Sequence, residues 1–208
     1  MQPHILKMLI KGEDEILDFK QTISSASKIA KTMVAFANHR GGTLLIGIRD
    51  NKTVAGIRTE DEKYMLDLAA SFYCKPEVKI KIEEWEIEGK LVLECTIFEG
   101  DEKPYYAKDE AAKWWAYIRV KDKCLLASKI VVDVLRRRAL KKGTQINYSS
   151  KETALFEYLN TNDKITLKQY SKMLNLSRQR ASKILVNLIS TGLIRNHTTE
   201  KTEFYTLS

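Results

Sequence analysis

Basic and amide side chains near the C-terminus are the residues of this chain best suited to contact a polyanion. The stretch from Lys164 to Arg195 contains seven Lys and Arg residues and no acidic residue. At its centre lie Arg178, Gln179 and Arg180. Arg can pair with guanine and Gln with adenine, and basic side chains also contact phosphates. The stretch is therefore either a nucleic-acid-binding surface or a solvated helix face that packs against another protein.

Three helices and a hairpin are predicted to position these side chains. Apolar residues recur at helical spacing in three segments, 151–159, 167–173 and 178–190. Thr166 and Ser177 immediately precede the second and third segments, and both are suitable N-cap residues. A polar hairpin tip at 195–203 then leads into a short strand.

This arrangement, two short helices across a tight turn and then a hairpin, resembles the winged helix-turn-helix family over residues 151–208. The exit sequence TGLI (191–194) also fits. The resemblance implies that the third helix lies in the major groove of double-stranded DNA. The implied DNA-binding residues are Ser177, Arg178, Gln179, Arg180, Ser182 and Lys183 on that helix, with Arg195 and Lys201 at the DNA backbone. A homodimer is expected, because palindromic sites are usual for this motif.

The boundary between two predicted domains lies near residues 143–150. A helix is predicted over 128–142 and ends in a cluster of basic residues followed by Gly143. Cations suit the negative end of a helix dipole, and glycine suits a left-handed cap. The polar residues that follow give a linker at 143–150, so the first domain is predicted at 1–142 and the second at 151–208.

The first domain mixes helices and strands. Strands are predicted at 17–20, 43–48, 54–57, 78–86, 91–98 and 115–120, and helices at 27–38 and 60–72. The segment 43–48 is continuously apolar, as is typical of a buried central strand. The pattern indicates an α+β fold.

Three segments of this domain resemble the divergent AlbA domain of the schlafen group. They are GEDEILDFK (12–20), KTMVAFANHRGGTLLIGIRDNKTVAGI (31–57) and YIRV (117–120). The sequence departs from the family pattern at His39-Arg40, where a small residue often stands, and at Asp18, where Glu is usual. The resemblance implies a mixed sheet with helices that serves as a sensor, a dimerisation module or a nucleic-acid-binding module. In bacteria such domains commonly precede a winged helix in transcription regulators.

A metal-dependent ribonuclease is an alternative that the same resemblance implies. Matched onto this chain, the acidic triad of RNA-cleaving schlafen proteins is Glu13, Asp18 and Asp50, and Lys20 would steady the scissile phosphate. Three carboxylates could hold Mg²⁺ or Mn²⁺ and activate water, with RNA as the substrate. However, the acidic stretch from Glu13 to Asp18 is also typical of a solvated surface, and Asp50-Asn51 is typical of a turn.

An ATP-binding regulatory domain is the second alternative, because proteins of this type are often described as ATP-binding. The adjacent glycines Gly41 and Gly42 favour this alternative at first sight, because phosphate-binding loops contain glycine. The chain has no GxxxxGK[ST] motif. These glycines also follow a predicted helix, whereas phosphates are held at helix N-termini. We therefore expect a left-handed helix cap here and assign no nucleotide-binding residue.

Composition excludes several other classes. The chain has 208 residues, a formal charge of +8, 44% hydrophobic residues and 30% charged residues. The hydrophobic content is high enough to bury a core, which excludes a chain that is disordered over most of its length. No apolar run reaches the roughly 18 residues that span a membrane. Three cysteines without a CxxC pair suit a reducing cytosol. We expect a cytoplasmic protein without a membrane partner, a metal site or a cofactor, and with no enzymatic activity unless it is the nuclease.

Adjacent tryptophans at 114 and 115 place one ring on each face of a predicted strand. One ring is expected in the core. The other is an ordinary surface aromatic or, less simply, a stacking platform for a base.

Overall fold

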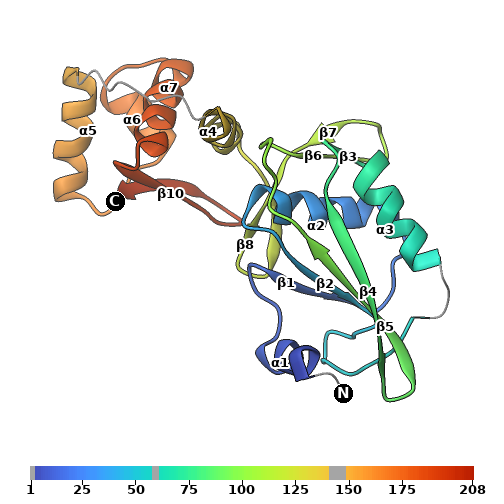
Figure 1. The fold of residues 1–208 in the computed structure, drawn as a ribbon. Coiled ribbons are helices and arrows are strands. Elements are labelled where there is room, and N and C mark those ends of the chain that lie inside the picture. The colour runs from blue at the N-terminus through green and yellow to red at the C-terminus, as the bar shows by residue number, and fades with distance from the viewer. Residues whose placement is uncertain (1–2, 58–60, 141–148) are drawn as a thin grey trace. The chain divides into compact units, whose positions relative to one another are not determined.

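The computed structural model describes residues 3–57, 61–140 and 149–208, which divide into two units, Met1–Ala127 and Ser128–Ser208 (Figure 1). Helices and strands mix in both units, which confirms the α+β fold class. No helix in these described ranges is long and apolar enough to cross a membrane.

The first unit contains most of the strands. In chain order its elements are α1 (Pro3–Lys11), β1 (Leu17–Lys20), α2 (Ala26–Asn38), β2 (Gly42–Ile46), α3 (Asp61–Phe72), β3 (Cys74–Lys75), β4 (Ile80–Ile87), β5 (Lys90–Ile97), β6 (Tyr106–Lys108), β7 (Trp114–Trp115), β8 (Tyr117–Val120) and β9 (Lys123–Leu126).

A four-stranded mixed sheet in the order β1-β2-β5-β4 forms the centre of this unit. β1 pairs with β2 in parallel, and the other pairs are antiparallel. Leu44 and Ile46 on β2 belong to the core under α2 and α3, whereas Leu45 belongs to the core under α1. Because alternate residues of a strand face opposite sides, the continuously apolar strand is covered on both faces, as predicted. Figure 1 shows α1 on one side of the sheet and α2 and α3 on the other.

Two predicted strands differ from the structure. Residues 54–57 form no strand, and only an isolated bridge joins Val54 to Ile48. The single strand predicted at 115–120 is split into β7, which pairs with β6, and β8, which pairs with β9. The chain changes partner at Ala116, because this residue's carbonyl accepts a hydrogen bond from the Ala127 amide instead.

The second unit is mainly helical. Its elements are α4 (Lys129–Ala139), α5 (Ser150–Thr161), α6 (Leu167–Met173), α7 (Arg178–Ser190), β10 (Ile194–Thr198) and β11 (Glu203–Leu207). The three helices lie where the apolar spacing and the N-cap residues predict them. The hairpin tip is shorter than predicted, because residues 195–198 and 203 belong to the paired strands β10 and β11 and leave only 199–202 in the turn. Tyr170 and Tyr205 are the largest side chains fully buried in its core.

Helix α4 groups with the second unit, whereas the sequence interpretation assigned residues 128–142 to the first. Ile130 and Val134 lie in the same core as Leu185 and Leu188 of α7. The apolar spacing of an amphipathic helix shows that one face is buried, but it does not show which domain's core buries that face. Most of the predicted linker at 143–150, including the expected cap at Gly143, lies outside the described residues.

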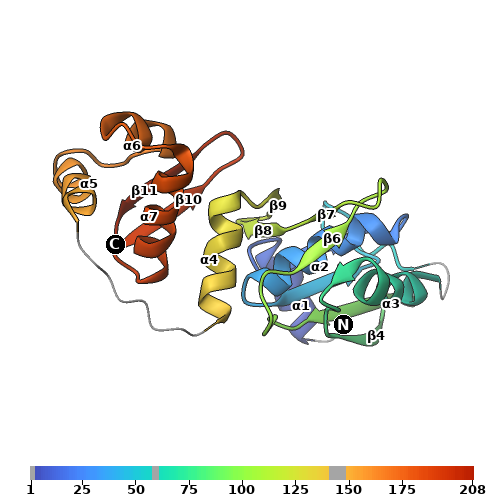
Figure 2. The same cartoon turned by 90° about the horizontal axis from the view of Figure 1, so that it is seen from above.

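The β10–β11 hairpin is fixed to the turn before α6. Ile165 and Tyr205 exchange two backbone hydrogen bonds, of 3.0 and 2.8 Å. The buried Tyr170 hydroxyl donates to the Lys151 carbonyl at 3.1 Å and so ties α6 to α5. The hairpin and the three helices therefore form one packed body, which Figure 2 shows from above.

Candidate nucleic-acid interface

The first two turns of α7 present polar side chains to solvent. Ser177 is the N-cap, and its hydroxyl accepts a hydrogen bond from the Arg180 amide at 3.3 Å. Arg178, Gln179, Arg180 and Lys183 are exposed, whereas Ala181, Ile184 and Leu185 face the core. No large apolar side chain is exposed on this part of the helix. The apolar face of the helix thus packs in the core, and three cationic side chains and one amide side chain are exposed on the opposite face.

The second half of α7 is covered by α4. Val186 and Ile189 are buried. An Nη1 of Arg137 donates to the Asn187 side-chain oxygen, and Arg138 donates to the Ile189 carbonyl at 3.3 Å. These arginines belong to the basic cluster that ends α4, and in the structure two of them hold α4 against α7.

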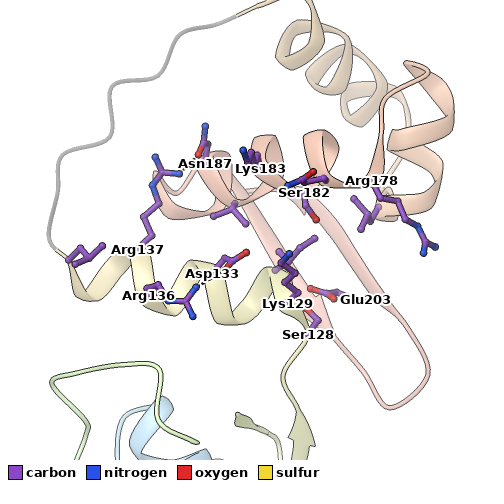
Figure 3. A pocket seen from close by; sticks show the side chains of 15 residues that line it. Ser128, Lys129, Asp133, Arg136, Arg137, Arg178, Ser182, Lys183, Asn187 and Glu203 are labelled. Carbon is purple, nitrogen blue, oxygen red and sulfur yellow. Dashed lines mark hydrogen bonds and ion pairs between the residues drawn. The ribbon is translucent and has the colours of Figure 1, made fainter. Parts of the chain in front are cut away.

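A groove of about 820 Å³ lies between α4 and α7. Figure 3 shows the two helices side by side, with charged side chains at the margins of the groove. It is lined by Ser128, Lys129, Ile130, Asp133, Arg136, Arg137, Leu140, Leu167, Arg178, Gln179, Ser182, Lys183, Val186, Asn187 and Glu203. Five of these residues are cationic and two are acidic, and Asp133 is already paired with Arg136 at 2.9 Å. The charged residues of the groove therefore carry an excess of positive charge, beside the apolar side chains of Ile130, Leu140, Leu167 and Val186.

The structure brings together four of the eight predicted DNA-binding residues at this groove. Arg178, Gln179, Ser182 and Lys183 line it, Ser177 caps the helix beside it, and Arg180 is exposed on the same two turns.

Arg195 and Lys201 lie elsewhere in the second unit. Arg195 lines a separate cavity of about 370 Å³ together with Arg138 and Ile189, near the other end of α7. Lys201 lies in the hairpin turn, which is closed by hydrogen bonds between Thr199 and Thr202. Both side chains are exposed, so they are available to a ligand, but they do not line the groove between α4 and α7.

In the first unit, the carboxylate of Asp18 is neutralised by two cations. Its Oδ1 lies 3.2 Å from Nη1 of Arg119 and its Oδ2 lies 2.5 Å from Nζ of Lys20. Asp18 and Arg119 are 5% exposed each. The guanidinium also donates to the carbonyl of Asp14 at 2.6 Å and lies 4.8 Å from the centre of the Phe36 ring. Asp18 and Lys20 therefore have structural partners where the nuclease alternative needs free ligands.

The other two predicted triad members are in different surroundings. Glu13 accepts a hydrogen bond from the Phe19 amide at 2.7 Å and so satisfies a donor on β1, the first strand in the sheet order β1-β2-β5-β4. Asp50 is exposed in a turn, where Asn51 accepts from the amide and the hydroxyl of Thr53. Among the described residues, no group of three His, Cys, Asp or Glu side chains could hold a metal ion.

The paired glycines have a packing role. Gly41 has φ +75°, and its amide donates to the Phe36 carbonyl at 2.9 Å, as a left-handed helix cap does. An added Cβ would lie 2.7 Å from the Ile97 carbonyl oxygen at Gly41, and 2.5 Å from the Phe36 ring at Gly42. Both positions face the protein, so the glycines are explained without a nucleotide.

Asn38, at the end of α2, joins the segment before β6 to the start of β8. Its amide nitrogen donates to the carbonyls of Tyr105 and Tyr117, both at 2.9 Å, and its oxygen accepts from the Tyr105 amide at 2.7 Å. All its contacts are to backbone, which makes it a structural clamp.

The family of the chain is decided by residues 13–128, which match the family model described as Schlafen, AlbA_2. This match covers more than half of the 208 residues and nearly all of the first unit. The chain belongs to the Schlafen, AlbA_2 family. The match supports nucleic-acid binding, or an ATP-related regulatory role, in general terms only.

Residues 121–202 match a second model, described as the PCI domain. This match covers α4 and the three helices that follow it, and it is less than half of the chain. It is a different family from the winged helix-turn-helix expected there, so the sequence resemblance of the second unit is not confirmed.

Two solved structures are similar to this Schlafen, AlbA_2 protein at low identity. The DIP2311 protein from Corynebacterium diphtheriae is 15% identical with a TM-score of 0.47, and the match covers 71% of this chain and 34% of that one. The N-terminal domain of a RecG-related protein from Nitrosomonas europaea is 23% identical with a TM-score of 0.41, covering 61% of this chain and 94% of that one. The chain thus spans about a third of the first structure, and neither likeness bears on function. No curated protein matches the chain.

Arg119 is the residue of the Schlafen, AlbA_2 unit whose role sequence analysis missed. It lies within YIRV (117–120), one of the segments that carry the family resemblance. The available signal was a charged residue on a half-apolar strand, because a buried arginine needs a carboxylate partner. Its partner Asp18 is 101 residues away, and spacing in the sequence does not connect them.

Proposed function

We propose that the second unit binds double-stranded DNA as a winged helix-turn-helix, with the first two turns of α7 in the major groove. The observation that carries the proposal is the set of exposed Arg178, Gln179, Arg180 and Lys183 side chains on a helix whose opposite face is buried. A helix that docked on an apolar protein partner would instead expose apolar residues here. The polar outer face therefore favours DNA over the protein-interaction alternative.

The covering of α7 by α4 limits which residues reach the bases. Because Val186 and Ile189 are buried, only the N-terminal half of α7 is free to enter a groove of the duplex. This is the half that contacts base edges in helix-turn-helix proteins. Arg178, Gln179 and Arg180 are assigned to base edges and Lys183 to a phosphate. Lys129, which lines the groove, is proposed as a further phosphate contact.

We further propose that the protein acts as a cytoplasmic transcription regulator and binds DNA as a homodimer. A single helix reads few base pairs, and two copies on a palindromic site extend the sequence that is read. The Schlafen, AlbA_2 unit is then the sensor, the dimerisation module or a second nucleic-acid-binding module.

The test is a salt-controlled binding assay after selection of bound sequences from a random duplex pool. The double variant Arg178→Ala/Arg180→Ala is expected to lose at least about 30-fold in affinity for the selected duplex, since each bidentate base contact contributes about 1–3 kcal/mol. The control Lys79→Ala/Lys81→Ala removes the same charge from exposed positions of the first unit and is expected to bind as the unchanged protein does. Equal affinity of the two double variants would refute the proposal.

A further inference from the structure

One face of the small three-stranded sheet in the first unit carries aromatic and lysine side chains. The sheet has the order β3-β6-β7, and its register pairs Lys75 with Tyr106 and Lys108 with Trp114. The alternate positions Cys74 and Ala107 are buried in the core. Because successive residues of a strand face opposite sides, Lys75, Tyr106, Lys108 and Trp114 share the outward face. We call these four residues, with Phe72, the aromatic–lysine face.

Lys108 lies against two rings on this face. Its Nζ is 4.4 Å from the centre of the Phe72 ring and 5.9 Å from the centre of the Trp114 ring. Phe72 is 55% exposed and Trp114 is 39% exposed. The Lys108 amide donates to the Tyr73 carbonyl at 2.9 Å, which fixes the end of α3 beside the strand. Backbone hydrogen bonds and cation–π contacts therefore fix the positions of the Phe72 and Trp114 rings.

Trp115 is held differently from its neighbour. It pairs with the buried Ala107, yet it is 40% exposed. The sequence predicts one of the two tryptophan rings in the core, and this prediction is wrong, because both rings are exposed. Its indole donates to Oδ2 of Asp109 at 2.8 Å, and Oδ1 of Asp109 accepts from the Lys113 amide. The bonds from the Lys113 amide and the Trp115 indole lower the pKa of Asp109. Trp115 and Asp109 thus secure the β6–β7 turn, and Trp114 is left on the outward face.

Exposed aromatic rings beside ammonium groups match the chemistry of an unpaired nucleic-acid strand. Each base offers a flat face for stacking, and each linkage offers a phosphate for a lysine. Paired bases in a duplex are already stacked and cannot lie on these rings. An apolar protein partner would gain nothing from Lys75 and Lys108, which would lose their hydration on docking. The combination of rings and cations favours the strand.

We infer that the aromatic–lysine face binds unpaired bases of single-stranded nucleic acid, with bases on Trp114 and Phe72 and phosphates at Lys75 and Lys108. This site is separate from the duplex contacts proposed for α7, and it does not depend on them. It gives the Schlafen, AlbA_2 unit its own ligand class.

The test uses the full chain and three fluorescent 12-mers, of deoxyuridylate, of uridylate and of abasic sites on a deoxyribose-phosphate backbone. Trp114→Ala is expected to weaken binding of both base-bearing strands by about tenfold, since stacking contributes about 1–3 kcal/mol per base. Phe72→Ala is expected to act in the same direction. Phe98→Ala removes another exposed ring, outside the aromatic–lysine face, and is expected to change nothing. Preference for one base-bearing strand identifies RNA or DNA as the ligand.

Two further arms separate stacking from charge. The abasic strand is expected to bind weakly to the unchanged protein and equally weakly to Trp114→Ala, and Lys108→Arg is expected to retain the binding that Lys108→Ala loses. If Trp114→Ala and Phe72→Ala bind the base-bearing strands as the unchanged protein does while remaining folded by circular dichroism, the inference is wrong. Equal binding of abasic and base-bearing strands would also overturn it.

The duplex proposal fails or holds separately. Arg178→Ala/Arg180→Ala is expected to leave the effect of Trp114→Ala on single strands unchanged. Trp114→Ala is expected to leave binding of the selected duplex unchanged.

Discussion

The charged residues around β1 and the polar residues at the start of α7 differ in their partners. Asp18 is closed off by Arg119 and Lys20 at 3.2 and 2.5 Å, and Glu13 is bound to a backbone amide. Arg178, Gln179, Arg180 and Lys183 instead extend into solvent from a helix whose other face is buried. A charged group that is paired inside the fold already has its bonding partners, whereas an exposed one is available to a ligand. The two regions therefore divide structural from binding charges.

Arg119 gives the largest expected effect. Replacing it with Met leaves the buried Asp18 carboxylate with only Lys20, and breaking a buried ion pair costs about 3–5 kcal/mol of unfolding free energy. Urea unfolding measures this change. Arg49→Met, at an exposed arginine of the same unit, is the matched control and is expected to stay within about 0.5 kcal/mol of the unchanged protein. Equal stability of the two variants would show that the Asp18–Arg119 pair is not structural.

A double-mutant cycle measures the coupling free energy between Asp18 and Arg119. Asp18→Asn and Arg119→Met are each expected to destabilise, and the double variant is expected to lose less than the sum by about 0.5–3 kcal/mol, because the two share one interaction. The free energies of unfolding of the four proteins give the coupling. Strict additivity would mean that Asp18 acts independently of Arg119.

Ser177 lies among the binding residues of α7 but acts on the helix itself. Ser177→Ala removes the acceptor for the Arg180 amide and is expected to cost about 1 kcal/mol in stability. Arg178→Ala, next to it, is expected to leave thermal unfolding unchanged. A stability loss for Arg178→Ala as large as that for Ser177→Ala would contradict the division between cap and binding residue.

Lys183 gives the smallest expected effect. Its proposed phosphate contact predicts that Lys183→Ala weakens duplex binding to all sequences alike and lowers the slope of log K against log salt by about 1. Affinities at several salt concentrations measure the slope. A change confined to one base position would instead place Lys183 at a base edge.

Local patterns predicted the helices and most strands of the fold, but not the division of residues 115–120 between β7 and β8, the absence of a strand at 54–57 or the long-range partners. The caps at Thr166 and Ser177, the helices after them and the hairpin follow from apolar spacing and short-range hydrogen bonding. The exposed half of α7 follows too, because a helix buries one face. The pairing of Asp18 with Arg119, the covering of α7 by α4 and the face shared by Phe72, Lys108 and Trp114 depend on contacts between distant segments. A single sequence carries no local signal for such contacts.

Backbone-amide exchange of the full chain with and without the selected duplex tests the central division most directly. The account predicts that duplex binding slows exchange in residues 177–183 and leaves residues 13–20 around β1 unchanged, since the charges there are already paired. Slowed exchange at 13–20 without any change at 177–183 would contradict it.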